Sequence, residues 1–167
     1  MNIRILNESD TQVYQELRLK ALKVNPEAFG STYEREAKFS VETVAERLKP
    51  NEDKFVLGAF ENDTSLVAIA TFMRESGIKT AHKGNIYGLF VTAEMRGKGL
   101  GKALMNEIIS RARTCSGLEQ INLTVVSDNE AAKNLYKSIG FQLYGVERNA
   151  LKFNGIYYNE DLMVLTL

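Results

Sequence analysis

A short run rich in glycine and basic residues is the part of the sequence whose residue types most directly suggest chemistry. It reads Arg96-Gly97-Lys98-Gly99-Leu100-Gly101-Lys102 and stands between an expected strand and an expected amphipathic helix. Glycines let the backbone approach a ligand closely and turn successive N–H groups toward one concave surface. The helix N-terminus adds partial positive charge, and the basic side chains add full charges. The run therefore predicts a binding site for an anion such as a phosphate group.

Two well-known phosphate-binding loops do not fit the spacing of this run. A Walker A loop needs glycine at the position of Arg96, and serine or threonine at the position of Ala103. A dinucleotide-binding fingerprint needs its third glycine where Lys102 stands. The spacing thus disfavours an ATP site of the Walker type and a Rossmann-type site. Taken alone, the run leaves a flexible basic loop without a ligand as the alternative.

Other reactive side chains are scarce. His82 is the only histidine and Cys115 the only cysteine, so an intramolecular disulfide is excluded, a structural zinc site lacks ligands, and a histidine-dependent catalytic triad is disfavoured. We assign neither residue a role and predict no metal.

Composition and charge narrow the class of protein further. The 167 residues carry 21 Lys and Arg against 21 Asp and Glu, so there is no basic excess of the kind that nucleic-acid binders show. No segment has the apolar length of a membrane span or of a signal peptide. We therefore expect a soluble, cytoplasmic protein without nucleic-acid or membrane partners, folded as a single domain over residues 1–167.

The elements that must position the glycine-rich run follow from apolar periodicity and turn signals. Strands are expected at residues 2–6, 54–60, 66–73, 85–92, 121–126, 141–152 and 156–165. Helices are expected from a cap at Ser9 or Asp10 to residue 24, from a cap at Ser40 to residue 48, over residues 99–113, and from Asn129 to residue 139. With about seven strands and about four helices, this order predicts a mixed α/β (α+β) domain rather than a regular βαβ alternation.

The central third of the chain resembles a known family. The pattern Arg96-x-x-Gly99-x-Gly101 resembles the pyrophosphate loop of GNAT N-acetyltransferases. Residues 86–91 look like the family's fourth strand, and residues 123–141 resemble its fifth strand and fourth helix with the Tyr-x-x-x-Gly-Phe ending. The resemblance implies a central mixed, mostly antiparallel sheet that splays between its fourth and fifth strands, and the order of elements agrees along the whole chain.

The resemblance also implies acetyl-CoA as the acyl donor and a set of residues that would hold it. Backbone groups of Leu89, Phe90 and Val91 would bind the pantetheine arm, and Asn129 would hydrogen-bond the arm near the sulfur. The pyrophosphate would lie on Arg96, Gly97, Lys98, Gly99, Leu100, Gly101 and Lys102. Tyr136 matches the position of the acid that protonates the departing thiolate, and packing at the edge of the core is its alternative role.

The implied reaction is direct attack of a primary amine on the thioester in a ternary complex, which needs no protein nucleophile. Phe29, Tyr33 and Glu34 fall where family members build the wall that faces the acceptor. Residues 86–91 contain no carboxylate, so Glu75 and Glu34 are the candidates for the general base.

Several readings of the function stay open at this stage. A small-molecule amine is the expected acceptor, and a protein N-terminus or a lysine side chain is the alternative. A non-catalytic acyl-CoA sensor is the reading from another class, and a nucleotide-binding regulator comes third. A homodimer is compatible with the sequence.

Overall fold

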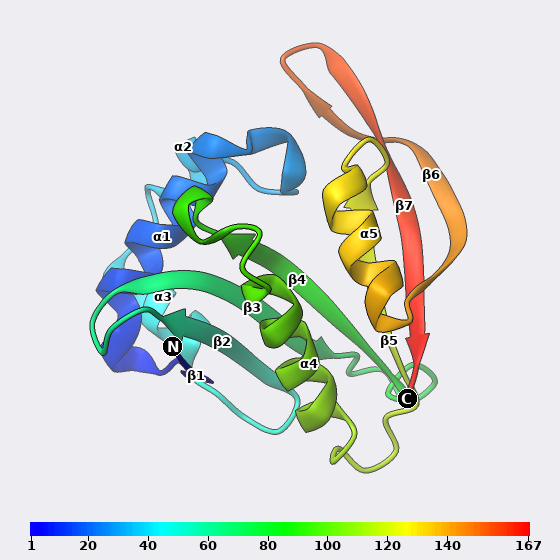
Figure 1. Cartoon of the computed structure of the whole chain (residues 1–167), viewed down its shortest axis with the longest axis horizontal. Helices are drawn as coiled ribbons and strands as arrows, with labels where there is room; N and C mark the ends of the chain where they lie inside the picture. Colours follow the sequence, from blue (N-terminus) through cyan, green and yellow to red (C-terminus); the bar gives the residue numbers. More distant parts are fainter.

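One seven-stranded sheet runs through the computed structural model, which describes residues 1–167 (Figure 1). Its strands are β1 (Asn2–Ile5), β2 (Lys54–Phe60), β3 (Leu66–Arg74), β4 (Lys83–Val91), β5 (Gln120–Val126), β6 (Gln142–Phe153) and β7 (Ile156–Thr166). The spatial order is β1-β2-β3-β4-β5-β7-β6. All neighbouring strands are antiparallel except β4 and β5, which are parallel. The predicted mixed, mostly antiparallel sheet is confirmed.

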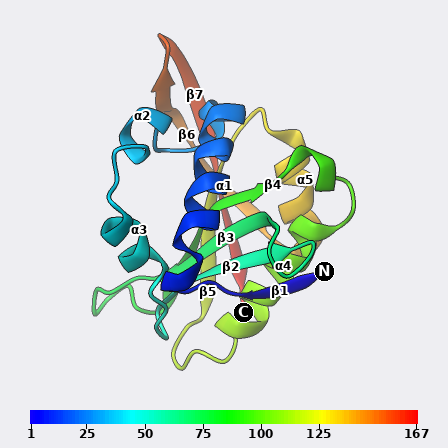
Figure 2. The same cartoon turned by 90° about the vertical axis from the view of Figure 1, so that its left-hand side faces the viewer.

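Helices cover both faces of this sheet. They are α1 (Thr11–Val24), α2 (Tyr33–Glu36), α3 (Val41–Leu48), α4 (Leu100–Ala112) and α5 (Glu130–Ile139), with short 3-10 turns at Glu8–Asp10, Pro26–Ala28 and Ala93–Met95. Figure 2 shows α1 and α3 on the side of the strands that faces away from α4 and α5. No helix is both long and apolar enough to cross a membrane.

Side chains of the central strands point alternately to the two faces of the sheet, and each face has its own hydrophobic core. Leu57 of β2 belongs to the buried cluster that contains Leu104 of α4, whereas the adjacent Val56 belongs to the cluster that contains Leu17 of α1. Successive side chains of a strand point to opposite faces, so a strand covered on both faces is apolar at nearly every position. This explains the continuous apolar runs of β2 and β3.

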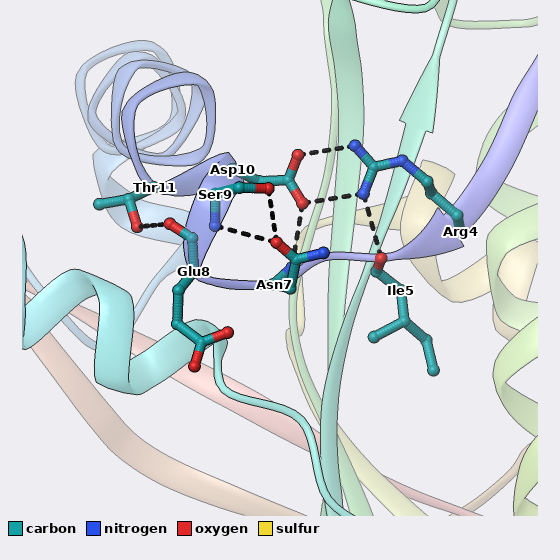
Figure 3. A network of polar contacts seen from close by, with 7 residues as sticks. All are labelled: Arg4, Ile5, Asn7, Glu8, Ser9, Asp10 and Thr11. Carbon is teal, nitrogen blue, oxygen red and sulfur yellow. Dashed lines mark hydrogen bonds and ion pairs between the residues drawn. The ribbon is translucent and has the colours of Figure 1, made fainter.

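The start of α1 agrees with the prediction in position but not in hydrogen bonding. Asp10, one of the two predicted caps, stands at the N-cap position, but its side chain makes no capping bond. The Asn7 side chain instead accepts a hydrogen bond from the Ser9 N–H at 2.9 Å and starts a 3-10 turn before the helix. The Asp10 carboxylate instead accepts from the Asn7 N–H at 2.9 Å and from Arg4 at 2.6 and 2.8 Å (Figure 3). The Asp10 side chain thus pairs with Arg4 of β1 and makes no capping bond to α1.

Other predicted ends are confirmed. Helix α1 stops before Pro26, and the Ser40 hydroxyl caps α3 by accepting from the Thr43 N–H at 3.1 Å. Gly140 ends α5 with a left-handed φ of 112°, a conformation that glycine adopts without strain. The additional helix α2 is a single turn capped by Thr32. Four residues are too few to show helical periodicity, so the sequence indicated four long helices and not this fifth one.

Candidate active site

Strands β4 and β5 are hydrogen-bonded neighbours only at their beginnings. Their register runs from Lys83 opposite Gln120 to Asn85 opposite Asn122 and ends there. Beyond this point β4 continues against β3 and β5 continues against β7, and the two strands diverge (Figure 1). Because the ladder with β5 ends at Asn85, the edge of residues 86–90 of β4 that faces β5 has no strand partner.

A cleft of about 1000 Å³ lies where the two strands diverge. Its walls come from β4, β5, the first turn of α4, one face of α5, Arg18 of α1, the loop that follows α1, and β7. We call this cavity the β4/β5 cleft. The side formed by β4, β5, α4 and α5 is its donor side, and the side formed by α1, the α1–α2 loop and β7 is its acceptor side.

The glycine-rich run lies on the donor side and offers an uninterrupted series of free donors. The backbone N–H groups of residues 97–102 donate to no acceptor within the chain, and Ala103 is the first residue of α4 whose N–H bonds back, to the Gly99 carbonyl at 3.0 Å. Gly97 and Gly99 have left-handed φ values of 74° and 79°, which side chains disfavour. Such a turn at a helix N-terminus concentrates N–H groups on one anion.

Gly101 is needed for a different reason. A Cβ at this position would lie 3.3 Å from Leu135 Cδ2 and 3.7 Å from Val91 Cγ2, whereas one at Gly97 or Gly99 would meet nothing within 4 Å. Gly101 thus sits between the strand and helix walls of the cleft, and a larger side chain there would fill space inside it.

The basic side chains of the run are not equivalent. Arg96 donates from Nε to the Val91 carbonyl at 3.0 Å and from Nη2 to Asn25 Oδ1 at 2.9 Å, so it ties the loop to the end of α1. Lys102 lines the cleft, but Lys98 lines a separate surface cavity, and its Nζ lies 3.7 Å from Met95 Sδ. Every other residue predicted to hold the donor lines the cleft.

Asn129 and Tyr136 reach the cleft from α5. The Asn129 side chain caps the helix by accepting from the Ala132 N–H at 3.1 Å, and its amide nitrogen has no partner within the chain. Tyr136 is 8% exposed and belongs to the core cluster, with its ring 6.0 Å from that of Phe141. Burial raises the pKa of Tyr136 to about 12, and the phenol is protonated at neutral pH, as an unperturbed tyrosine would also be. Tyr136 therefore both packs in the core and presents a protonated group to the cleft.

A second cavity of about 440 Å³ adjoins the acceptor side. It lies between the α1–α2 loop, α2 and the β6–β7 hairpin, and we call it the hairpin cavity. Phe29, Tyr33 and Glu34, the residues predicted to face the acceptor, all line it. Only Phe29 also lines the β4/β5 cleft, and together with Tyr158 it forms part of the wall that the two cavities share.

The candidate bases from the sequence do not line the β4/β5 cleft. Glu34 faces only the hairpin cavity, and Glu75 accepts a hydrogen bond from Asn85 Nδ2 at 2.7 Å outside the cleft. Glu160 of β7 does line it. Burial, together with the negative charge of Glu147 on the neighbouring strand, raises the pKa of Glu160 above the usual range. Sequence reasoning missed Glu160 because nothing in the sequence says that β7 inserts between β5 and β6.

A buried ion cluster supports the acceptor side. Glu36 of α2 is 2% exposed and accepts hydrogen bonds from Arg18 of α1 at 2.9 and 3.0 Å and from Arg47 of α3 at 3.0 Å. Burial alone would raise the pKa of Glu36, but the hydrogen bonds and charge of Arg18, with the charge of Arg47, lower it to about 2. Arg18 also lines the β4/β5 cleft and was likewise missed from the sequence.

Residues 3–162 match the family model described as "Acetyltransferase (GNAT) domain". The chain is 32% identical over 77 residues to the L-amino acid N-acetyltransferase AaaT of Escherichia coli (strain K12), a match that covers 46% of this chain and 48% of that protein. This chain thus spans about half the length of that curated relative.

Solved structures agree in fold. An acetyltransferase of GNAT family from Streptococcus pneumoniae superposes with a TM-score of 0.88 at 20% identity and covers 99% of this chain and 98% of its own. Arabidopsis thaliana NAA60 in complex with acetyl-CoA gives a TM-score of 0.76 at 19% identity, with coverage of 99% and 98%.

Proposed function

The chain belongs to the GNAT acetyltransferase family, and we propose that it transfers the acetyl group of acetyl-CoA to a primary amine in a ternary complex. One observation carries this proposal: residues 97–102, whose N–H groups have no acceptor within the chain, line a cleft of about 1000 Å³ between diverging strands at every position except Lys98. The N–H series suits a pyrophosphate, and the unpaired edge of β4 suits the amide groups of a pantetheine arm.

The residues present on the donor side fit that ligand. Gly97 and Gly99 allow the left-handed turns of a loop whose N–H groups have no acceptor within the chain, and Lys102 adds positive charge. The free amide nitrogen of Asn129 is available to a carbonyl of the arm. Lys98 faces away from the cleft, so we assign its part in pyrophosphate binding to its backbone N–H.

Direct transfer releases a thiolate and a proton, and the cleft offers a group for each. The Tyr136 phenol is protonated at neutral pH, so its O–H is available to hydrogen-bond and protonate the departing sulfur. A backbone N–H on the unpaired edge of β4 supplies a fixed donor for the developing oxyanion.

Glu160 is the carboxylate that we assign as the general base. It lies on the acceptor side, and its raised pKa makes it a better proton acceptor than an exposed glutamate. It attracts the ammonium form of the acceptor and takes one proton from it before attack, so that a neutral amine forms the N–C bond. The nitrogen loses a second proton as the thiolate departs, which balances the proton that Tyr136 gives to the sulfur.

The hairpin cavity favours a small acceptor over a folded protein. Its volume of about 440 Å³ is close to the lower end of small-molecule sites, and it meets the cleft at Phe29 and Tyr158. A flexible protein N-terminus remains the second candidate, because the cavity lies between surface loops and an extended chain could enter it.

A thiol-release assay with acetyl-CoA tests the proposal. Amino acids, polyamines, aminoglycosides and short peptides serve as acceptors, and mass spectrometry identifies the acetylated product. We expect release that depends on at least one amine. Tight binding of acetyl-CoA without release for any amine would contradict the enzyme and favour the acyl-CoA sensor.

A further inference from the structure

Arg18 occupies an unusual position for a residue of a buried ion cluster, because it is also part of the cleft wall. Its Nε and Nη2 donate to the two oxygens of Glu36 at 3.0 and 2.9 Å, and its side chain is 12% exposed. The remaining terminal nitrogen, Nη1, makes no hydrogen bond within the chain. A guanidinium that uses one edge for Glu36 still has N–H donors on the other side.

The cluster has an uncompensated positive charge. Arg18 and Arg47 share the single carboxylate of Glu36, which stays ionised because its pKa is about 2. Only Arg18 of the two cations lines the cleft. The net charge of this cluster therefore acts on the cleft through Arg18.

The place of Nη1 along the cleft is fixed by its neighbours. It lies 3.4 Å from the point where a Cβ on Gly88 would stand, at the irregular part of β4 where the register against β3 shifts. Gly88 has a left-handed φ of 63°. The Phe29 ring lies 5.0 Å from Arg18 Cζ and holds the guanidinium from the loop side. The free nitrogen is thus held beside β4 on the acceptor side of the cleft.

We propose that Arg18 binds a carboxylate of the acceptor, so that the acceptor is an amino acid or another amine that carries a carboxylate. A rigid guanidinium with free donors and excess positive charge is the group that recognises a carboxylate best. Glu160 lines the same cleft and offers the opposite charge to the amine. This inference rests on the proposed acetyl transfer and makes Arg18 a specificity-determining residue.

The test compares acceptors that differ only in the carboxylate. Initial rates of thiol release are measured for the common amino acids and for their amides, with wild type, Arg18→Gln and Arg18→Lys. Arg47→Gln is the matched control, because it removes a cation from the same carboxylate without touching the cleft. Melting temperatures are recorded for all variants.

We expect wild type to favour an amino acid over its amide by about 10–100-fold in kcat/KM, the range of a charge-assisted hydrogen bond. Arg18→Gln should abolish that preference by raising KM for the amino acid more than for its amide. Arg18→Lys should restore part of the preference, and Arg47→Gln should retain it.

Two results would overturn the proposal. The proposal is refuted if the wild-type protein acetylates amides as well as amino acids, or acetylates only amines without a carboxylate. Acetyl transfer itself would still stand in both cases. This test uses the wild-type protein alone, so it holds even if Arg18→Gln fails to fold. An equal loss for both acceptors in folded Arg18→Gln shows instead that Arg18 supports the reaction or the fold. Failure of the proposed function itself is different, since no acceptor of any kind would then release thiol.

Discussion

The two sides of the β4/β5 cleft are assembled in opposite ways. The donor side is built largely from neighbouring stretches of chain, residues 86–102 and 123–136, and its chief donors are backbone N–H groups. The acceptor side brings together side chains from far apart: Arg18 of α1, Phe29 of the loop, and Glu160 of β7. One side presents the main chain, and the other presents charged side chains.

This difference indicates how the two sides respond to change. Backbone N–H donors suit a ligand that is the same in every reaction, as the acyl donor is, and they depend on glycine at only a few positions. Side chains held by tertiary contacts, such as the ion cluster of Glu36, can be exchanged without altering the donor loop. We therefore expect mutations on the donor side to affect binding or chemistry with any acceptor, and mutations on the acceptor side to affect stability or choice of acceptor.

The largest expected effect comes from the donor side. Tyr136→Phe removes the hydroxyl group that donates the proton but keeps the ring in the core. Turnover should therefore fall by about 10²–10⁴, with little change in acetyl-CoA affinity or melting temperature. Steady-state kinetics and thermal melts measure both. Tyr136→Ala is the companion variant, which should also lose stability through the cavity that it leaves. Wild-type turnover in the Phe variant would reduce Tyr136 to a packing residue.

Glu36→Gln tests the support of the acceptor side. It leaves Arg18 and Arg47 without their shared carboxylate, and loss of one partner from a buried pair typically costs about 3–5 kcal/mol in the free energy of unfolding. Urea titration measures this loss, and Glu34→Gln on the same short helix should stay within about 0.5 kcal/mol of wild type. Acetyl-CoA should still stabilise the Glu36 variant, because the donor loop is built separately.

The pH dependence of stability gives the same cluster a second test. The pKa of Glu36 is about 2 in the folded chain against an ordinary value of 4.5. Its ionisation therefore contributes roughly 3 kcal/mol to the free energy of unfolding above pH 4.5, and this contribution is lost as the pH falls toward 2. Glu36→Gln should lack this part of the acid destabilisation. An identical pH profile in both proteins would show that Glu36 is not held ionised by its arginines.

A smaller effect is expected for Glu160→Gln. Water can substitute for a base, so we expect a decrease in kcat/KM of about 10²-fold, the lower end for acid–base groups. In wild type the rate should rise as the pH passes through the raised pKa of Glu160, because only the carboxylate accepts a proton. The variant should lose that rise. Glu147→Gln, which removes the neighbouring charge, should shift the rise to lower pH.

The comparison of the two sides also explains what the sequence could predict. The donor side depends on local patterns: the glycine spacing before α4, the capping Asn129 and the turn signals around the strands. The strands and most helix ends were predicted for the same reason. The missing capping bond of Asp10 at the start of α1 was not, because the interaction of Asp10 with Arg4 competes with capping and depends on where β1 lies.

The residues of the acceptor side could not be predicted from the sequence, because tertiary packing brings them together. Glu160 and Arg18 are ordinary charged residues in their local sequence, and only the insertion of β7 beside β5 and the packing of α1 against β3 bring them to one cleft. Lys98 shows the converse, since a basic residue within the right motif turns its side chain away. Motif spacing thus locates backbone sites better than it orients side chains.

The central claim is that the β4/β5 cleft binds acetyl-CoA, and calorimetric titration of acetyl-CoA into wild type, Gly101→Val and Ala103→Val tests it most directly. Gly101 lies inside the cleft between Leu135 and Val91, whereas Ala103 is exposed in the same helical turn and lines no part of it. We expect micromolar-range affinity for wild type and Ala103→Val, no heat with ATP, and at least a tenfold loss, about 1.4 kcal/mol, for Gly101→Val. Unchanged affinity in folded Gly101→Val, or ATP that competes equally for the site, would contradict the claim.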